Sequence, residues 1–226
     1  MTRPLVASER PALITLDVGG TLGKSDRPGL TSALLAASPL ARRDATVALR
    51  DRLHVVSSIN DQVVTDVCRA LRIPISAFPR HLTAAPLRLY PATRRALPLL
   101  HELLPLVTLS NVTCVDTDPE QLDELLRPWV TGHFPSYRIG HAKPEPRAFH
   151  AAAHHAGVNV AQIIHIGDNW ECDTLGAANA GASTVWISGG RPTPPIAPPL
   201  RRHVAVAHDL TDAVTHVRTL CARRPA

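Results

Sequence analysis

The chain is poor in lysine and in aromatic residues. Only Lys24 and Lys143 are lysines among its 24 basic residues, and aromatic residues make up 4% of the 226 positions. The net charge is +5, but the arginines are scattered, whereas nucleic-acid-binding proteins gather positive charge on one face and interleave it with aromatic rings. A nucleic acid is therefore not expected as a partner. Because arginine is the general cation here, each lysine suggests a special use, and a compact ammonium suits a point contact to a phosphate or a carboxylate.

Long apolar runs and paired cysteines are missing as well. No segment approaches about 18 uninterrupted apolar residues, which argues against a membrane span. The start of the chain, Met1–Pro4, lacks the basic-then-apolar layout of a signal peptide. The four cysteines have neither paired nor metal-ligand spacing, which favours free thiols in a reducing compartment. With 45% apolar residues, the chain is expected to be a soluble cytoplasmic protein without a membrane partner.

Strand-like and helix-like segments alternate along the chain. Buried strands are predicted at residues 12–16, 106–109, 163–166, 183–187 and 204–206, with a short one near 137–139. Helices are predicted at 62–71 behind a cap at Asn60 or Asp61, at 92–104, from Asp118 to 126, from Pro146 to 156, at 173–180 and at 211–220. Repeated strand–helix–strand units indicate an α/β fold with a doubly wound parallel sheet. Residues from about 30 to 82 carry helical periodicity alone and predict a helical insertion.

Polar side chains stand at the ends of three predicted strands. Asp17 follows the first strand and opens a glycine-rich turn, Ser110 ends the second, and Asp168 follows the strand 163–166. In a parallel sheet these ends lie at one edge, where open α/β sheets bind their ligands. The three side chains are therefore expected to meet.

The residues expected at this edge suit a metal and a phosphate. Asp17, Asp168 and Asp173 would crowd carboxylates that need a cation, and an oxygen-only ligand set suits Mg²⁺. The Ser110 hydroxyl, the backbone amide of Asn111 and an ammonium suit phosphoryl oxygens. The combination predicts Mg²⁺-assisted phosphoryl chemistry with a carboxylate nucleophile.

Four motifs in order resemble those of the haloacid dehalogenase (HAD) superfamily over essentially the whole chain. Residues 17–22 (Asp-Val-Gly-Gly-Thr-Leu) resemble the first motif, which runs Asp-x-Asp-x-Thr in the phosphatases of the family. Residues 108–111 resemble the second motif, 143–146 the third, and 167–173 with 176–177 the fourth. The resemblance implies a Rossmannoid core made of residues 1–24 and 86–226, and a small helical cap at residues 25–85. Capped members act on small molecules, so a small phosphorylated molecule is the expected partner, and nothing predicts an oligomer.

The resemblance also implies roles for individual residues. Asp17 would attack phosphorus and form an aspartyl-phosphate, and Thr21 would help to hold the catalytic turn. Ser110 would bind a phosphoryl oxygen, and Lys143 would steady both Asp17 and the phosphoryl charge. The residues that contact substrate would be Thr21, Ser110, Asn111 and Lys143. Mg²⁺ would be held by Asp17, the carbonyl of Gly19, Asp168 and, directly or through a water, Asp173.

Gly19 departs from the first motif of the phosphatases. It stands where their second aspartate protonates the leaving group and activates water, and losing a general acid–base costs roughly 10²–10⁴-fold. Three interpretations follow: a phosphatase or phosphoryl-transfer enzyme with another acid or an easy leaving group, a non-catalytic protein that binds a phospho-ligand or a partner, and a 2-haloacid dehalogenase. Lys24, Asp26 and His141 are candidate substitutes for the acid. Arginines of the predicted cap are candidates for binding an anionic substrate body: Arg42, Arg43, Arg50, Arg52, Arg69 and Arg72, together with His54.

Overall fold

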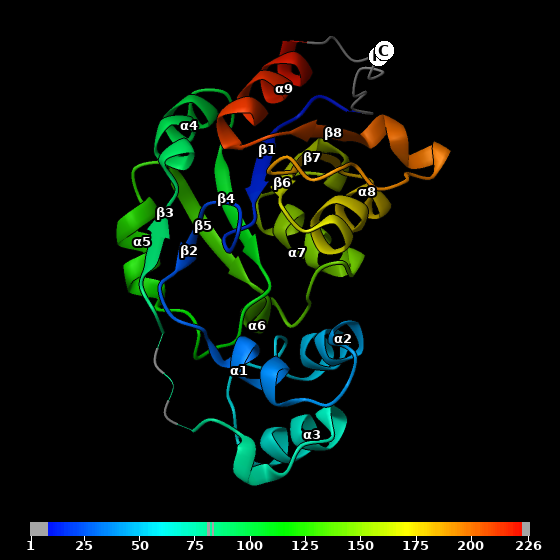
Figure 1. Cartoon of the computed structure of the whole chain (residues 1–226). Helices are drawn as coiled ribbons and strands as arrows, with labels where there is room; N and C mark the ends of the chain where they lie inside the picture. Colours follow the sequence, from blue (N-terminus) through cyan, green and yellow to red (C-terminus); the bar gives the residue numbers. More distant parts are fainter. Residues whose placement is uncertain (1–8, 81, 83, 223–226) are drawn as a thin grey trace.

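A six-stranded parallel sheet forms the centre of the computed structural model, which describes residues 9–222 except 81 and 83 (Figure 1). The Met1–Pro4 segment therefore lies outside the described residues. The strand order is β5-β4-β1-β6-β7-β8. The strands are β1 (Leu13–Leu16), β4 (Leu106–Ser110), β5 (Val130–Pro135), β6 (Ile163–Gly167), β7 (Ser183–Ile187) and β8 (Val204–Ala207). The central strands are short and almost wholly buried, as parallel strands covered on both faces must be.

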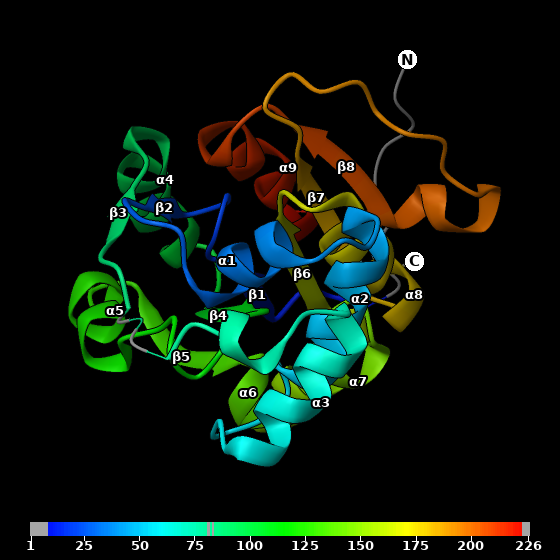
Figure 2. The same ribbon diagram turned by 60° about the horizontal axis from the view of Figure 1, so that its bottom comes forward.

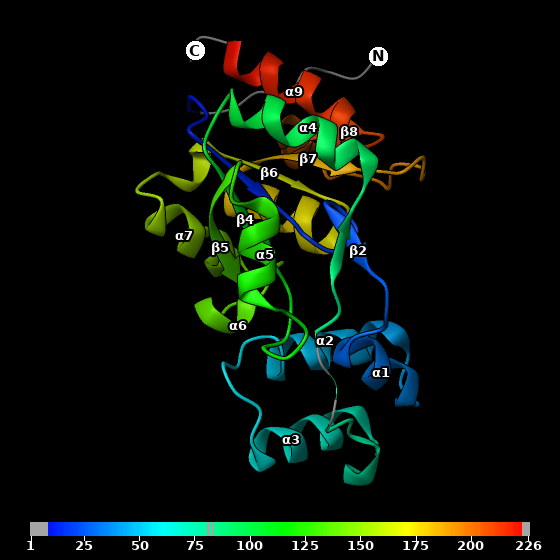
Figure 3. The ribbon, with the colours of Figure 1, turned by 90° about the vertical axis from the view of Figure 1, so that its left-hand side faces the viewer.

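Helices cover both faces of the sheet. Ile14 and Leu16 of β1 pack into one apolar cluster with α4 (Pro91–His101), α5 (Pro119–Leu126) and α9 (Leu210–Ala222). Leu13 packs into the other, with α7 (Pro146–His155) and α8 (Gly176–Ala180). Figure 3 shows α4 and α9 side by side on one side of the sheet. The doubly wound α/β architecture predicted from the alternation is confirmed.

The predicted helix starts are confirmed at three positions where the sequence has a capping residue or a proline. The Asn60 side chain accepts a hydrogen bond from the Val63 amide at the start of α3 (Asp61–Leu71), and Asp118 accepts from Glu120 and Gln121 at the start of α5. Pro146 occupies the first turn of α7, where its missing N–H leaves no bond unmade. Caps are local in sequence, so these starts could be predicted without tertiary information.

A helical insertion (residues 30–77) lies between two short strands, β2 (Gly23–Ser25) and β3 (Leu87–Leu89), which pair as an antiparallel ribbon. It consists of α1 (Leu30–Ala37), α2 (Arg42–Arg52), α3 and the 3₁₀ turn η1 (Ile75–Ala77). The three helices share an apolar cluster of their own, separate from those of the sheet. In Figure 2 the insertion lies in front of the edge toward which the strands point.

One prediction about local structure was wrong, and one predicted helix starts earlier than expected. Residues 137–139 belong to a short helix, α6 (Ser136–Ile139), which Gly140 closes with φ +71°, and the strand is β5, immediately before it. The helix predicted at 173–180 begins earlier, as a π-helical turn at Trp170–Leu175, before α8 continues it. That turn includes Asp173, whose carboxylate contacts Lys143, a residue distant in sequence.

All four cysteines, Cys68, Cys114, Cys172 and Cys221, carry free thiols. Within the part of the chain that the structure describes, no helix has the length and apolar character needed to cross a membrane.

Candidate functional site

The carboxylates predicted at the strand ends come together. Asp17 follows β1 and Asp168 follows β6, while Asp173 lies in the π-helical turn that comes after. One carboxylate oxygen from each of these three residues lies within 4.8 Å of the others. Parallel pairing of β1 with both β4 and β6 places the strand ends side by side, so Ser110, at the end of β4, belongs to the same edge.

Lys143 lies beneath these acids and is 1% exposed. Its Nζ donates to Asp17 Oδ1 at 2.8 Å and to the Leu109 carbonyl at 2.6 Å, and it lies 2.7 Å from Asp173 Oδ1. An ammonium has three protons, so every donor has an acceptor. Burial disfavours the charge, but the two carboxylates outweigh it and raise the pKa of Lys143. The ammonium is therefore a permanent positive charge against the predicted nucleophile.

Asn111 fixes the backbone of Lys143. Its Oδ1 accepts from the Lys143 amide at 2.8 Å and its Nδ2 donates to the Lys143 carbonyl at 2.6 Å. This pair of bonds joins the end of β4 to the loop that carries the lysine. The sequence predicted a phosphate contact for the backbone amide of Asn111. The structure shows a different role for its side chain, which holds the backbone of Lys143 in place.

The acids are held as a group that needs a cation. Burial, with the neighbouring charges of Asp173 and Asp168, raises the pKa of Asp17 to about 7 against the opposing charge of Lys143. Burial and Asp173 also raise the pKa of Asp168. Neighbouring negative charges raise the pKa of a carboxyl group, and a bound divalent cation stabilises the ionised form. The donor set of carboxylate oxygens thus fits Mg²⁺.

Asp173 is the most tightly held of the three acids. It is 1% exposed, its Oδ2 accepts from the Asn169 amide at 2.8 Å, and its Oδ1 faces both Lys143 and His165. Burial opposes its ionisation, but Lys143 and His165 outweigh burial and lower its pKa. Gly167 makes the fit possible, because a Cβ there would lie 2.3 Å from Asp173 Cγ.

Asp168 is more open. Its side chain is 28% exposed, with Oδ2 lying 3.6 Å from the Arg191 guanidinium. Its backbone carbonyl accepts from Trp186 Nε1 at 3.0 Å and from Arg191 Nη2 at 2.8 Å. Gly20, at φ +90°, brings the first turn so close that a Cβ would lie 2.6 Å from Asp168 Oδ1. The Asp168 backbone is thus fixed while its carboxylate stays accessible.

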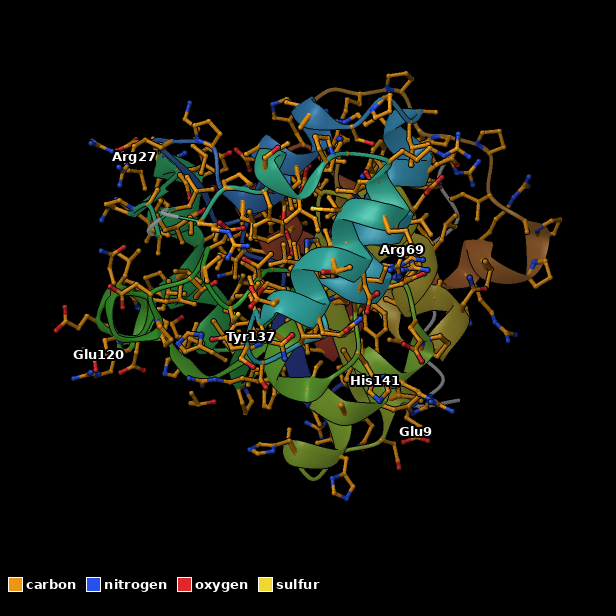
Figure 4. The ribbon with its side chains drawn as sticks, turned by 90° about the horizontal axis from the view of Figure 1, so that it is seen from below. Glu9, Arg27, Arg69, Glu120, Tyr137 and His141 are labelled. Carbon is orange, nitrogen blue, oxygen red and sulfur yellow. The ribbon has the colours of Figure 1, made fainter. Side chains whose placement is uncertain are left out.

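A cavity of about 350 Å³ opens onto Asp17. Asp17, Gly19, Ser110 and Asn111 line one end, and its walls come from the β2–β3 ribbon, the loop before α5, α5 itself and α6. Figure 4 looks onto this edge: Tyr137, a wall residue, lies near the centre of the view beside α3, while Arg27 and Glu120 lie at the periphery. A Cβ at Gly19 would meet nothing within 4 Å, so the missing side chain leaves free space beside the nucleophile.

Several predicted contact residues lie away from this cavity. Thr21 is 3% exposed, and its hydroxyl lies 3.3 Å from Asp17 Oδ2 instead of facing the cavity. Asp26 pairs with Arg88, and His141 lies 3.3 Å from Glu145. Among the described residues, the cavity lining does not include Lys24, Asp26, His141 or the arginines that were predicted to bind substrate.

Sequence reasoning missed two features of the site. The first is a buried pair behind Asp173, made of Thr15 on β1 and His165 on β6. A histidine within the run Ile163-Ile164-His165-Ile166, next to the fourth motif, was the signal available for it. The second is Asp116, which lines the cavity and accepts from the Leu30 amide at 2.7 Å. Its sequence context carries no comparable signal.

Comparison with known proteins gives short matches in sequence. A family model described as HAD-hydrolase-like matches residues 141–213, a range that holds Lys143, Asp168 and Asp173. The bovine (Bos taurus) haloacid dehalogenase-like hydrolase domain-containing protein 3 is 41% identical over 60 residues, 26% of this chain and 24% of that protein. A Thermus thermophilus phosphoserine phosphatase is 36% identical over 84 residues, 35% of this chain and 34% of that protein. The chain thus spans between a quarter and about a third of the curated relatives it matches.

Comparison with solved structures extends the likeness to nearly the whole chain. A 2-haloacid dehalogenase from Pseudomonas syringae aligns with a TM-score of 0.60 at 17% identity, over 92% of this chain and 99% of the other. The HAD-hydrolase YfnB from Bacillus subtilis, solved with magnesium, aligns with a TM-score of 0.58 at 17% identity over the same shares. At these identities the likeness concerns the fold. The family model thus matches the part of the chain that holds the third and fourth motifs, and the fold shared with HAD proteins extends over nearly the whole chain.

Proposed function

We propose that the chain is an Mg²⁺-dependent phosphatase or phosphoryl-transfer enzyme that acts on a small phosphorylated metabolite. The observation that carries the proposal is the placement of Asp17 between a buried ammonium and two further carboxylates at the end of an open cavity. A carboxylate in this position can act as a nucleophile when a metal ion balances the neighbouring negative charges. A cavity of about 350 Å³ suits a small ligand, and Ser25 and Ala85, at the two ends of the proposed cap, are among its lining residues.

In the proposed reaction an Asp17 oxygen attacks phosphorus, and the bond from phosphorus to the leaving oxygen breaks with its electron pair on that oxygen. The leaving oxygen takes a proton from water. Ser110 and the backbone amide of Asn111 donate hydrogen bonds to the phosphoryl oxygens, and Lys143 keeps Asp17 ionised and oriented. Water then attacks the aspartyl-phosphate at phosphorus, which releases inorganic phosphate and restores the carboxylate.

Mg²⁺ held by Asp17, the Gly19 carbonyl and Asp168, with Asp173 behind them, would neutralise charge on the phosphoryl group. Asp173 is already engaged by Lys143, His165 and the Asn169 amide. Its share in holding the ion is therefore indirect, through the orientation of Lys143.

Gly19 limits the substrates this site can use. Without a general acid beside the leaving oxygen, esters of good leaving groups and acyl phosphates are the substrates expected to react fastest. The free space at Gly19 makes this testable, since an aspartate fits there without a clash. Gly19→Asp is expected to raise turnover of alkyl phosphates by roughly 10²-fold or more and to change that of acyl phosphates little.

The decisive experiment measures phosphate release from p-nitrophenyl phosphate, acyl phosphates and sugar phosphates, with and without Mg²⁺, for the wild type and Asp17→Asn. Turnover that needs both Mg²⁺ and Asp17 supports the proposal. Phosphate release that persists in Asp17→Asn contradicts it. A thermal unfolding curve of Asp17→Asn serves as the control for folding.

Two alternatives have specific observations behind them. Gly19 favours a non-catalytic protein that binds a phospho-ligand or a partner, which would show Mg²⁺-dependent ligand binding without turnover of any ester. The fold shared with the Pseudomonas syringae 2-haloacid dehalogenase favours dehalogenation, which would show as metal-independent halide release from a 2-haloacid. The phosphatase proposal stands above the second because Asp168 supplies an accessible carboxylate next to Asp17.

A further inference from the structure

A histidine is fully buried behind the site and the proposed reaction does not use it. His165 is 0% exposed and lies in the middle of β6, among three isoleucines. A buried imidazole is costly unless both ring nitrogens find partners. Here both do: Nδ1 lies 2.8 Å from Thr15 Oγ1 and Nε2 lies 3.2 Å from Asp173 Oδ1. The ring also packs edge-to-face with Phe149, with the two ring centroids 5.2 Å apart.

The partners define the protonation of the ring. The Asp173 carboxylate can only accept, so Nε2 carries the proton. Nδ1 on the other side of the ring faces the Thr15 hydroxyl at 2.8 Å, and the hydroxyl can donate to it. Thr15 and His165 lie directly opposite each other in the β1–β6 ladder. The sheet itself therefore sets the place of the ring.

The chain of contacts continues to the nucleophile. The Asp173 oxygen that accepts from His165 also lies 2.7 Å from Lys143 Nζ, and Nζ donates to Asp17 Oδ1 at 2.8 Å. Each member is buried. Without the donor from His165, Oδ1 of Asp173 would keep Lys143 as its one described partner and Oδ2 would keep the Asn169 amide, so the carboxylate would lose one of the three contacts that set its orientation.

We propose that His165, oriented by Thr15, is a positioning residue that fixes the Asp173 carboxylate so that Asp173 holds the Lys143 ammonium on Asp17. The inference rests on the proposed function for its effect on turnover. The arrangement of Lys143 that it describes is independent of the substrate. His165 does not touch the reacting atoms and acts only through Asp173.

A second threonine–histidine pair offers a matched control. Thr108 and His133 lie opposite each other in the β4–β5 ladder, and Thr108 Oγ1 lies 2.9 Å from His133 Nδ1. Among the described residues, however, Nε2 of His133 has no hydrogen-bond partner, and Asp123 lies 3.8 Å away. The chain thus contains two cross-strand threonine–histidine pairs, of which one is connected to Lys143 and the other is not.

The test uses the scarcity of lysine. With ¹⁵N-labelled lysine the chain gives two side-chain ammonium signals, and in a Lys24→Arg background only that of Lys143 remains. His165→Phe and Thr15→Val, made in that background, are expected to shift or broaden the Lys143 signal, while Thr15→Ser and His133→Phe leave it in place. Thr15→Ser keeps the hydroxyl, and His133→Phe makes the same ring change outside the chain of contacts.

Turnover supplies a second readout. His165→Phe is expected to lower kcat roughly 10- to 100-fold with little change in KM, the size of one hydrogen bond to a charged group, and Thr15→Val is expected to follow in the same direction. An unchanged Lys143 signal in folded His165→Phe and Thr15→Val overturns the inference, as does an equal shift in His133→Phe. If His165→Phe does not fold, Thr15→Val decides. If the wild type turns over no phosphate ester, the proposed function fails, and the Lys143 signal still decides the inference.

Discussion

The site at the sheet edge and the helical insertion bury polar groups in opposite ways. At the site Asp17, Lys143, Asp173 and His165 are buried together and each is bonded to others of the group. The insertion is an apolar cluster with one buried histidine, His54, whose Nε2 lies 2.9 Å from Thr31 Oγ1 and whose Nδ1 has no partner among the described residues. The hydrogen bonds at the site fix the orientation of its side chains, whereas the insertion is held together mainly by apolar packing.

The polar contacts between the two regions are correspondingly light. Asp116 accepts from the Leu30 and Thr31 amides at the start of α1, at 2.7 and 3.4 Å. Arg43 lies 3.7 Å from Glu171, and both side chains are mostly exposed. Under the proposed function, a closely bonded site beside a lightly attached insertion would allow a substrate to enter and water then to be excluded.

The largest expected effect on stability comes from removing a charge from the buried site. Asp173→Asn removes a charge that Lys143 faces at 2.7 Å, and losing one partner of a buried pair costs about 3–5 kcal/mol. Asp168→Asn changes an acid that is 28% exposed and is expected to change the free energy of unfolding by less than about 1 kcal/mol. Urea unfolding without metal measures both. Equal losses would mean that the two acids are held alike.

The insertion is expected to respond to pH through His54. Burial lowers the pKa of His54 to about 4 from 6.5, against the opposing charge of Asp116. Below pH 6.5 the unfolded chain takes up a proton that the folded one refuses, so stability is fully present above that pH and falls as pH drops toward 4. The loss between pH 6.5 and 4.5 is about 2 kcal/mol.

Other acids titrate in the same range, so the quantity to measure is the difference between the wild type and His54→Gln in urea unfolding at several pH values. The variant lacks the titrating ring, so its stability is expected to fall less on acidification. Parallel curves for the two proteins would show that His54 is not the group responsible.

The smallest effects are expected at the contacts between the two regions. Asp116→Ala removes the acceptor for the first amides of α1, which costs about 1 kcal/mol for a helix cap. Glu171→Gln, the control, weakens an exposed pair and is expected to change the unfolding curve by no measurable amount. Limited proteolysis within residues 30–77 is expected to quicken for Asp116→Ala alone. Faster cleavage of both variants would place the attachment elsewhere.

The sequence predicted what depends on local pattern. The strand at 183–187, the caps at Asn60 and Asp118, and the convergence of Asp17 and Asp168 all follow from short-range signals and from the rule that parallel strand ends share an edge. Thr15 and His165 are 150 residues apart, and Asp116 and Leu30 are 86 apart. Contacts of that kind depend on strand register and on how the loops close, which no local pattern encodes.

The contacts of Lys143 also determine how much of the chain must be present before the site can assemble. Its acceptors are the carbonyl of Leu109 and the carboxylates of Asp17 and Asp173, which reach from the first strand to the turn after β6. A growing chain that has left the ribosome only as far as β5 therefore has neither the ammonium nor Asp173. The cluster of Asp17, Lys143 and Asp173 can therefore form only after β6 and the turn that follows it have joined the first half of the sheet, so the first half of the chain alone cannot build the site.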